Sequence, residues 1–138
     1  MVLKKLECHF SGKNLDKKDL FGKSDPYLVI SKLTDEEDGI SEIARTEVIK
    51  KTLNPKWEPL CVVFESTNRG DIQVKISCYD HDLDKDDELI GEFYTSLFEI
   101  TKGKTSTVEW NLINPQKLQS KRSYKNSGVI TLAQVNVL

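Results

Sequence analysis

Residues 71–80, DIQVKISCYD, decide the fold class of this chain. Apolar residues at positions 72, 74, 76 and 78 alternate with polar residues at positions 73, 75 and 77. Successive side chains of a strand point to opposite faces of a sheet, so this period of two predicts a strand buried on one side. The same alternation recurs around Leu6, Trp110 and Thr131, where it predicts strands over 2–10, 106–112 and 128–137.

Shorter apolar runs bounded by turn-forming residues predict four more strands, over 27–33, 43–50, 59–65 and 89–94. Only residues 95–101 have a helical pattern, and residues 114–127 are expected to form a polar, basic connection. Eight short strands without long helices predict an all-β antiparallel sandwich or barrel. A length of 138 residues suits a single domain over 1–138.

Composition and charge limit the function classes. A net charge of -2 argues against a general nucleic-acid-binding protein. Cys8, Cys61 and Cys78 have no pairing pattern, which indicates free buried thiols in a reducing compartment. The start MVLKK lacks the apolar core of a signal peptide, and no apolar run approaches the ~20 residues of a membrane span. We therefore expect a cytoplasmic protein that is not secreted and whose membrane contact is peripheral.

The charges are concentrated in blocks. Residues 80–88 hold six acids against Lys85, a net charge of -5, whereas residues 102–125 hold six bases against Glu109, a net charge of +5. Six carboxylates within nine residues repel one another unless a counter-charge is present. Hard oxygen ligands suit Ca²⁺, which takes about six to eight of them, better than Mg²⁺, which keeps several waters.

Two acidic loops are candidates for a calcium site. The spacing of Asp80, Asp82 and Asp84 starts like an EF-hand, but Lys85 stands at the sixth position, Gly91 stands at the twelfth, and the flanks are predicted strands. The EF-hand interpretation is therefore rejected. A second acidic loop, 19–26, precedes the strand at 27–33. Loops from different strands can converge at one end of a sandwich and form a cup without a helix.

Short motifs resemble those of C2 domains. KSDPY at 23–27, NPKW at 54–57, YDHD at 79–82 and LIGE at 89–92 occur in the order and spacing of that family. RTEVI at 45–49, WNLINP at 110–115 and YKNSG at 124–128 are similar to the second C2 domain of the copines, and the resemblance covers almost the whole chain. It implies an eight-stranded antiparallel β-sandwich with calcium-binding loops at one end. Copines usually add another C2 domain and a von Willebrand A-type domain, so we expect a fragment of a larger copine-like protein or a protein of different architecture.

The resemblance also implies the metal ligands. Asp19, Asp25, Asp80 and Asp82 match four family aspartates, and the fifth falls at Glu88, one methylene longer. This departure leaves open that Asp86 or Asp87 coordinates instead. Backbone carbonyls of Leu20 and His81 are expected to complete the shells of two Ca²⁺ ions.

The expected partner is an anionic phospholipid membrane. Leu20, Phe21 and Leu83 fall at predicted loop tips, and insertion is favoured for Phe21 and Leu83, with Lys23 and Lys85 at the rim. Headgroups of phosphatidylserine would complete the ion's coordination. The basic residues Arg45, Lys50 and Lys51 form a weaker candidate for phosphoinositides, against the simpler interpretation of a solvated strand face.

The resulting hypothesis is a calcium-dependent electrostatic switch that recruits a parent protein to the plasma membrane or other anionic membranes when calcium rises. Five ligand carboxylates carry -5, and two Ca²⁺ ions would bring this to -1. The alternative is a calcium-independent protein–protein interaction module. An enzyme is not expected, because the sequence has no Gly-rich phosphate loop, no convincing Ser/His/Asp set and only two histidines.

Overall fold

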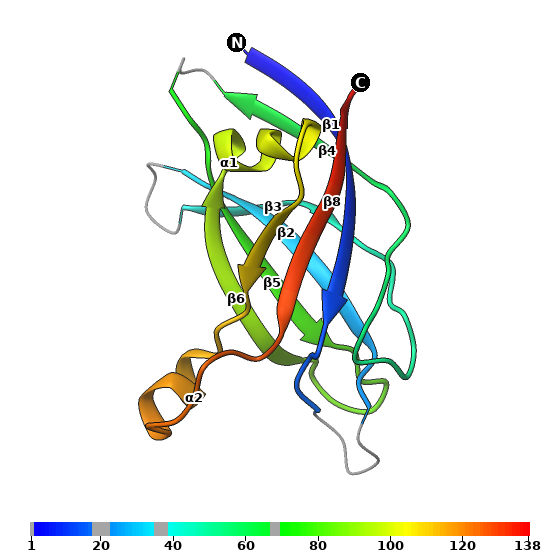
Figure 1. Ribbon diagram of the computed structural model, residues 1–138, viewed down its shortest axis with the longest axis vertical. Helices are drawn as coiled ribbons and strands as arrows, with labels where there is room; N and C mark the ends of the chain where they lie inside the picture. The colour runs from blue at the N-terminus through cyan, green and yellow to red at the C-terminus, as the bar shows by residue number, and fades with distance from the viewer. Residues whose placement is uncertain (1, 18–22, 35–38, 67–69) are drawn as a thin grey trace.

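The computed structural model describes residues 2–17, 23–34, 39–66 and 70–138, which form two packed antiparallel sheets (Figure 1). The predicted all-β, eight-stranded antiparallel sandwich is thereby confirmed. The strands are β1 (Val2–Lys13), β2 (Pro26–Leu33), β3 (Ile40–Arg45), β4 (Leu60–Ser66), β5 (Gln73–Asp80), β6 (Glu88–Ser96), β7 (Val108–Asn111) and β8 (Val129–Val137). The short helices are α1 (Leu97–Thr101), η1 (Lys102–Lys104) and α2 (Pro115–Ser120).

The strand order of the sheets is β4-β1-β8-β7 and β3-β2-β5-β6. The first and last strands are therefore neighbours, and Leu138 N donates to Lys5 O at 2.9 Å. Figure 1 shows both termini at one end of the sandwich, together with α1. The connection between β5 and β6 and the start of β2 lie at the other end, which we call the loop end.

The alternating residues of the sequence form the core between the sheets. Leu6 and Phe10 of β1 pack in one cluster with Val74 and Ile76 of β5, and all four are buried. Burial also raises the pKa of the Cys8 thiol to about 12, so this thiol stays protonated. The expectation of three buried thiols is wrong for Cys61, which is exposed on β4.

The third strand differs from its prediction, because it occupies Ile40–Arg45 rather than 43–50. The Thr46 side chain causes the early end, because its Oγ1 accepts from Leu28 N at 2.8 Å and replaces the next ladder bond with β2. The chain then turns toward the loop end, where Ile49 N donates to Pro26 O at 3.2 Å.

Helix α2 is a second difference, since the sequence pattern predicts a connection without a helix over 114–127. Asn114 caps α2, with its Oδ1 accepting from Gln116 N at 3.0 Å, and Pro115 stands in the first turn. Proline is tolerated there because the first helical amides have no partner within the helix. The Asn-Pro pair therefore carries a helix-start signal as well as a turn signal.

Gly91 lets the sheets approach closely near the loop end. A Cβ at this position would lie 2.9 Å from Leu112 Cβ and 3.2 Å from Ile113 N. Next to it, Glu92 N donates to Ile113 O at 2.9 Å and Ile113 N donates to Glu92 O at 2.9 Å. These bonds join β6 to the segment that follows β7.

We predict that Gly91→Ala lowers the free energy of unfolding by about 1–3 kcal/mol, because the added methyl group must push the backbone at 112–113 away. Gly70→Ala is the matched control, since a Cβ there meets nothing within 4 Å, and a change within about 0.5 kcal/mol is expected. Urea denaturation followed by tryptophan fluorescence measures both. Equal effects of the two substitutions would contradict this account of the sheet contact.

Candidate functional site

Three strands bring acidic residues together at the loop end. The register pairs Pro26 of β2 with Asp80 of β5, and Asp80 in turn with Glu88 of β6. Asp25, Asp80 and Glu88 therefore lie on three adjacent strands at the same edge. The antiparallel pairing of β2, β5 and β6 is what places them there.

Backbone amides fix the two central carboxylates. Asp25 N donates to Asp80 Oδ1 at 2.8 Å, and Lys51 N donates to Asp25 Oδ1 at 2.7 Å. Lys51 adopts a φ of 56° in this turn, and His81 N donates to Asp25 O at 3.0 Å. The segment after β3 thus supports the Asp25 side chain, and the β2 and β5 ends are tied to each other.

Asp87 holds the connection between β5 and β6 in shape. Its Oδ1 accepts from Asp82 N at 2.9 Å, and its Oδ2 accepts from the Tyr27 hydroxyl and lies 3.3 Å from His81 Nδ1. The hydrogen bonds from Tyr27 and Asp82 hold the pKa of the Asp87 carboxyl below its ordinary value. Asp87 is therefore charged at neutral pH and braces the connection, with Oδ1 bonded within the loop and Oδ2 bonded to Tyr27 of β2.

The Tyr27 ring connects this brace to the sheet. It stacks on Tyr79 with 5.7 Å between ring centroids, and Arg45 Cζ lies 5.7 Å from its centroid. Burial and the hydrogen bond to Asp87 raise the pKa of the Tyr27 hydroxyl, which keeps it protonated and able to donate. Arg45 also donates to Glu42 at 2.6 and 2.8 Å, so part of its charge is already compensated.

The tip of the β5–β6 connection carries a cation and an apolar side chain. Lys85 Nζ lies 3.7 Å from Glu88 Oε1 and 4.0 Å from Asp82 Oδ2. Asp82 Oδ1 accepts from Asp84 N at 2.8 Å, which shapes the tip. Leu83 is 86% exposed there. The lysine of residues 80–88 thus sits between two of the carboxylates expected to hold an ion.

Known proteins share this architecture. Residues 4–113 match the family model of the C2 domain. The chain belongs to the C2 domain family. The chain is similar to the solved structure of BON1-C2B, with 28% sequence identity and a TM-score of 0.75. The match covers 98% of this chain and 92% of that one.

More distant structures share the fold alone. A C2 domain of plant extended synaptotagmin 1 is 20% identical, with a TM-score of 0.65 over 98% of this chain and 92% of that one. Human GIVD cytosolic phospholipase A2 is 15% identical, with a TM-score of 0.62 over 98% of this chain but 17% of that enzyme. A C2 domain is a non-catalytic module that often binds Ca²⁺ and phospholipids.

The described part of this C2 domain contains only some of the predicted site. Asp25, Asp80, Asp82, Glu88 and His81 lie at the loop end, whereas Asp19, Leu20 and Phe21 lie outside the described residues. Among the described residues, no three His, Cys, Asp or Glu side chains form a group that could hold a metal ion. The donors that are present are nevertheless carboxylates, whose hard oxygens fit Ca²⁺.

The remaining candidates surround this end of the C2 sandwich. Lys50 and Lys51 lie in the turn whose backbone supports Asp25, and both are exposed. Lys23 directly precedes the Ser24–Asp25 segment and is exposed. None of the helices within the described ranges is long and apolar enough to cross a bilayer.

We predict that Tyr27→Phe lowers the free energy of unfolding without calcium by about 1 kcal/mol, because Asp87 loses a hydrogen bond while the aromatic stack remains. Amide hydrogen exchange at Asp82 should also become faster, since its acceptor is less firmly held. Tyr94→Phe is the control, because Tyr94 is exposed and its hydroxyl has no hydrogen-bond partner among the described residues. If Asp82 exchange is the same in both variants, Asp87 does not brace the loop.

Proposed function

We propose that this C2 domain binds Ca²⁺ at the loop end and, with the ion bound, docks on anionic phospholipid. The observation that carries the proposal is the junction of β2 and β5, where Asp25 N donates to Asp80 Oδ1 at 2.8 Å and ties together one acidic residue from each of the two motifs. Asp82 and Glu88 flank the same junction, and we infer that Asp19 joins them from the first loop.

The residues have separate roles in this proposal. Asp19, Asp25, Asp80 and Asp82 supply four carboxylates, and Glu88 supplies the fifth. Asp87 keeps the loop in shape. Carbonyl oxygens of Leu20 and His81 are proposed to complete the shells of two ions. Bound calcium would supply positive charge and coordination positions that lipid phosphate or serine carboxylate oxygens can occupy.

The membrane contact combines apolar and basic side chains. Leu83 is exposed at the tip, and burying such a side chain in lipid is worth about 1.5–3 kcal/mol. Phe21 is proposed to insert from the first loop, with Lys23 and Lys85 at the rim. Lys50, Lys51 and Arg45 are a weaker candidate surface for phosphoinositides, because Arg45 is already paired with Glu42.

The proposed setting is a longer protein that moves from the cytoplasm to phosphatidylserine-containing membranes when calcium rises. Motifs shared with the second C2 domain of the copines, such as RTEVI at 45–49, support a copine-like parent. That parent would bring any protein partners, and no nucleic-acid partner is proposed.

We predict that Asp80→Asn and Asp25→Asn each weaken calcium binding at least about tenfold and abolish calcium-dependent sedimentation with phosphatidylserine vesicles, because each removes a ligand charge. The amide oxygen of the new side chain can still accept the bonds from Asp25 N and Lys51 N, so the fold should persist. Calorimetric titration and vesicle sedimentation measure the two effects.

Asp84→Asn is the matched control, because Asp84 is an exposed tip residue whose loss of charge should leave both measurements nearly unchanged. Unchanged sedimentation of Asp80→Asn and Asp25→Asn would reject the calcium site. Calcium-insensitive binding by the unaltered protein, together with a constant melting temperature, would instead favour a calcium-independent interaction module.

Lys85 gives the proposal a second test. Its ammonium lies near Glu88 and Asp82, where it offsets part of their repulsion and opposes a cation that uses the same oxygens. Because Lys85 is 68% exposed, it can move to the rim at little cost when an ion binds. There it would face the negatively charged membrane.

We therefore predict opposite effects of Lys85→Gln in two measurements. Calcium affinity without lipid should rise about twofold to fivefold, since a competing charge is removed. Binding to phosphatidylserine vesicles at saturating calcium should weaken, since a basic contact is lost. Lys104→Gln removes an exposed charge at the opposite end and should change neither. Changes of the same sign in both measurements would show that Lys85 does not exchange between these roles.

A further inference from the structure

Helix α2 and the residues after it form a basic projection that the calcium proposal does not use. We call residues 115–127 the α2 arm; it contains four bases, at positions 117, 121, 122 and 125, and no acid. Lys121, Arg122 and Lys125 are exposed, and Leu118 between them and Lys117 is 58% exposed. An exposed apolar side chain among bases is the composition of an interfacial contact with anionic lipid.

The charges of the arm are largely uncompensated. Lys117 Nζ lies 2.6 Å from Asp16 Oδ2 and is neutralised by it. Lys121, Arg122 and Lys125 form no ion pair with any residue in the described ranges. The arm therefore presents three unpaired positive charges to the surroundings.

The arm is firmly mounted on the sandwich. Asn114 N donates to the Tyr124 hydroxyl at 2.9 Å, and this hydroxyl lies 2.5 Å from Ser127 Oγ. Ser127 is fully buried, and its N donates to Leu112 O at 2.8 Å. These bonds join the two ends of the arm at its base and anchor its backbone to the sandwich.

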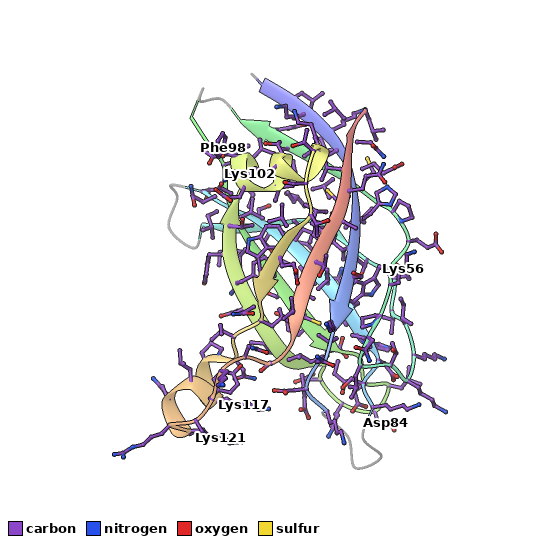
Figure 2. The ribbon with its side chains drawn as sticks, viewed as in Figure 1. Lys56, Asp84, Phe98, Lys102, Lys117 and Lys121 are labelled. Carbon is purple, nitrogen blue, oxygen red and sulfur yellow. The ribbon has the colours of Figure 1, made fainter. Side chains whose placement is uncertain are left out.

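Two further contacts place the arm at the loop end. Asn114 Nδ2 donates to Leu89 O at 3.2 Å, one residue after Glu88. The ion pair of Lys117 with Asp16 ties α2 to the chain just before the first acidic loop. Figure 1 shows α2 projecting outward at this end, away from the termini, and Figure 2 shows Lys117 and Lys121 on the projection and Asp84 across from them.

We propose that the α2 arm is a second contact surface for anionic phospholipid, which binds independently of calcium and sets the orientation in which the loops reach the membrane. This inference rests on the proposed membrane function of the loop end. The occupant is a lipid surface because a protruding arm with three unpaired bases matches a broad negative plane. The arm and the acidic residues 80–88 lie at the same end of the molecule, so both would meet the same surface. The arm would attract that surface while the ion-free acidic residues repel it.

The test uses a triple variant that carries Lys121→Gln, Arg122→Gln and Lys125→Gln. Its binding to vesicles of phosphatidylcholine and phosphatidylserine, in a ratio of about seven to three, is compared with that of the unaltered protein. Each base near an anionic surface contributes about fivefold in affinity, so the triple variant should bind on the order of 100-fold more weakly at low salt. The weak binding that remains in EGTA should disappear, and the salt dependence of binding in calcium should become shallower. Calcium affinity without lipid should stay unchanged.

The matched control combines Lys4→Gln, Lys5→Gln and Lys104→Gln, which removes the same charge at the end with the termini. Equal losses in control and arm variants would overturn the proposal, because they would reflect net charge alone. Unchanged vesicle binding with lost heparin binding would also overturn it and assign the arm to a soluble polyanion. If the arm variant melts at a lower temperature, Arg122→Gln alone must still weaken vesicle binding about fivefold.

The calcium function and the arm can fail separately. If the unaltered protein binds vesicles equally in calcium and in EGTA, the calcium switch is rejected, while the difference between arm and control variants in EGTA still decides the role of the arm. If binding depends on calcium but the arm variant equals the unaltered protein, only the arm proposal is rejected.

Discussion

The loop end depends on backbone amides that offset the repulsion between its gathered negative charges. Asp25 N, Lys51 N and Asp82 N each donate to a carboxylate oxygen of Asp80, Asp25 or Asp87. Such charge-assisted bonds stabilise a carboxylate, and at Asp87 the bonds from Tyr27 and Asp82 hold the pKa of the carboxyl below its ordinary value. The amide donors therefore hold the carboxylates of Asp25, Asp80 and Asp87 in place without an ion.

The sandwich supplies these donors through strand register. Because β2 pairs with β5 and β5 with β6, the residues that enter and leave the strands at this end are neighbours in space although far apart in sequence. The tie between Glu92 and Ile113 then joins β6 to the chain that leads into α2. Main-chain bonds thus join the ends of β2, β5 and β6 to one another, and join β6 to the segment at the base of the α2 arm.

The sequence predicts the parts of the fold that depend on local pattern. Alternation at 71–80 identifies β5, and the acidic motifs identify the residues that β2, β5 and β6 bring together. The predicted end of β3 is wrong because it depends on Thr46 bonding to Leu28, a contact across the sheet. The brace between Tyr27 and Asp87 joins residues 60 apart, so no local pattern reveals it. The position of Lys85 likewise follows from the folded tip of its loop. The sequence prediction lacks α2, although Asn114-Pro115 carries a helix-start signal.

The division of charge at the loop end gives a physical reason for a switch that does not depend on total charge. The chain as a whole is near neutral, at -2, but the acidic tip of residues 80–88 and the bases of the α2 arm stand on the same end of the molecule. The electrostatic field therefore changes sign across this end, and such a field steers how the domain approaches a charged surface. If bound calcium neutralised residues 80–88, their repulsion of an anionic membrane would disappear. The proposed attraction between the α2 arm and that membrane would then be unopposed at this end.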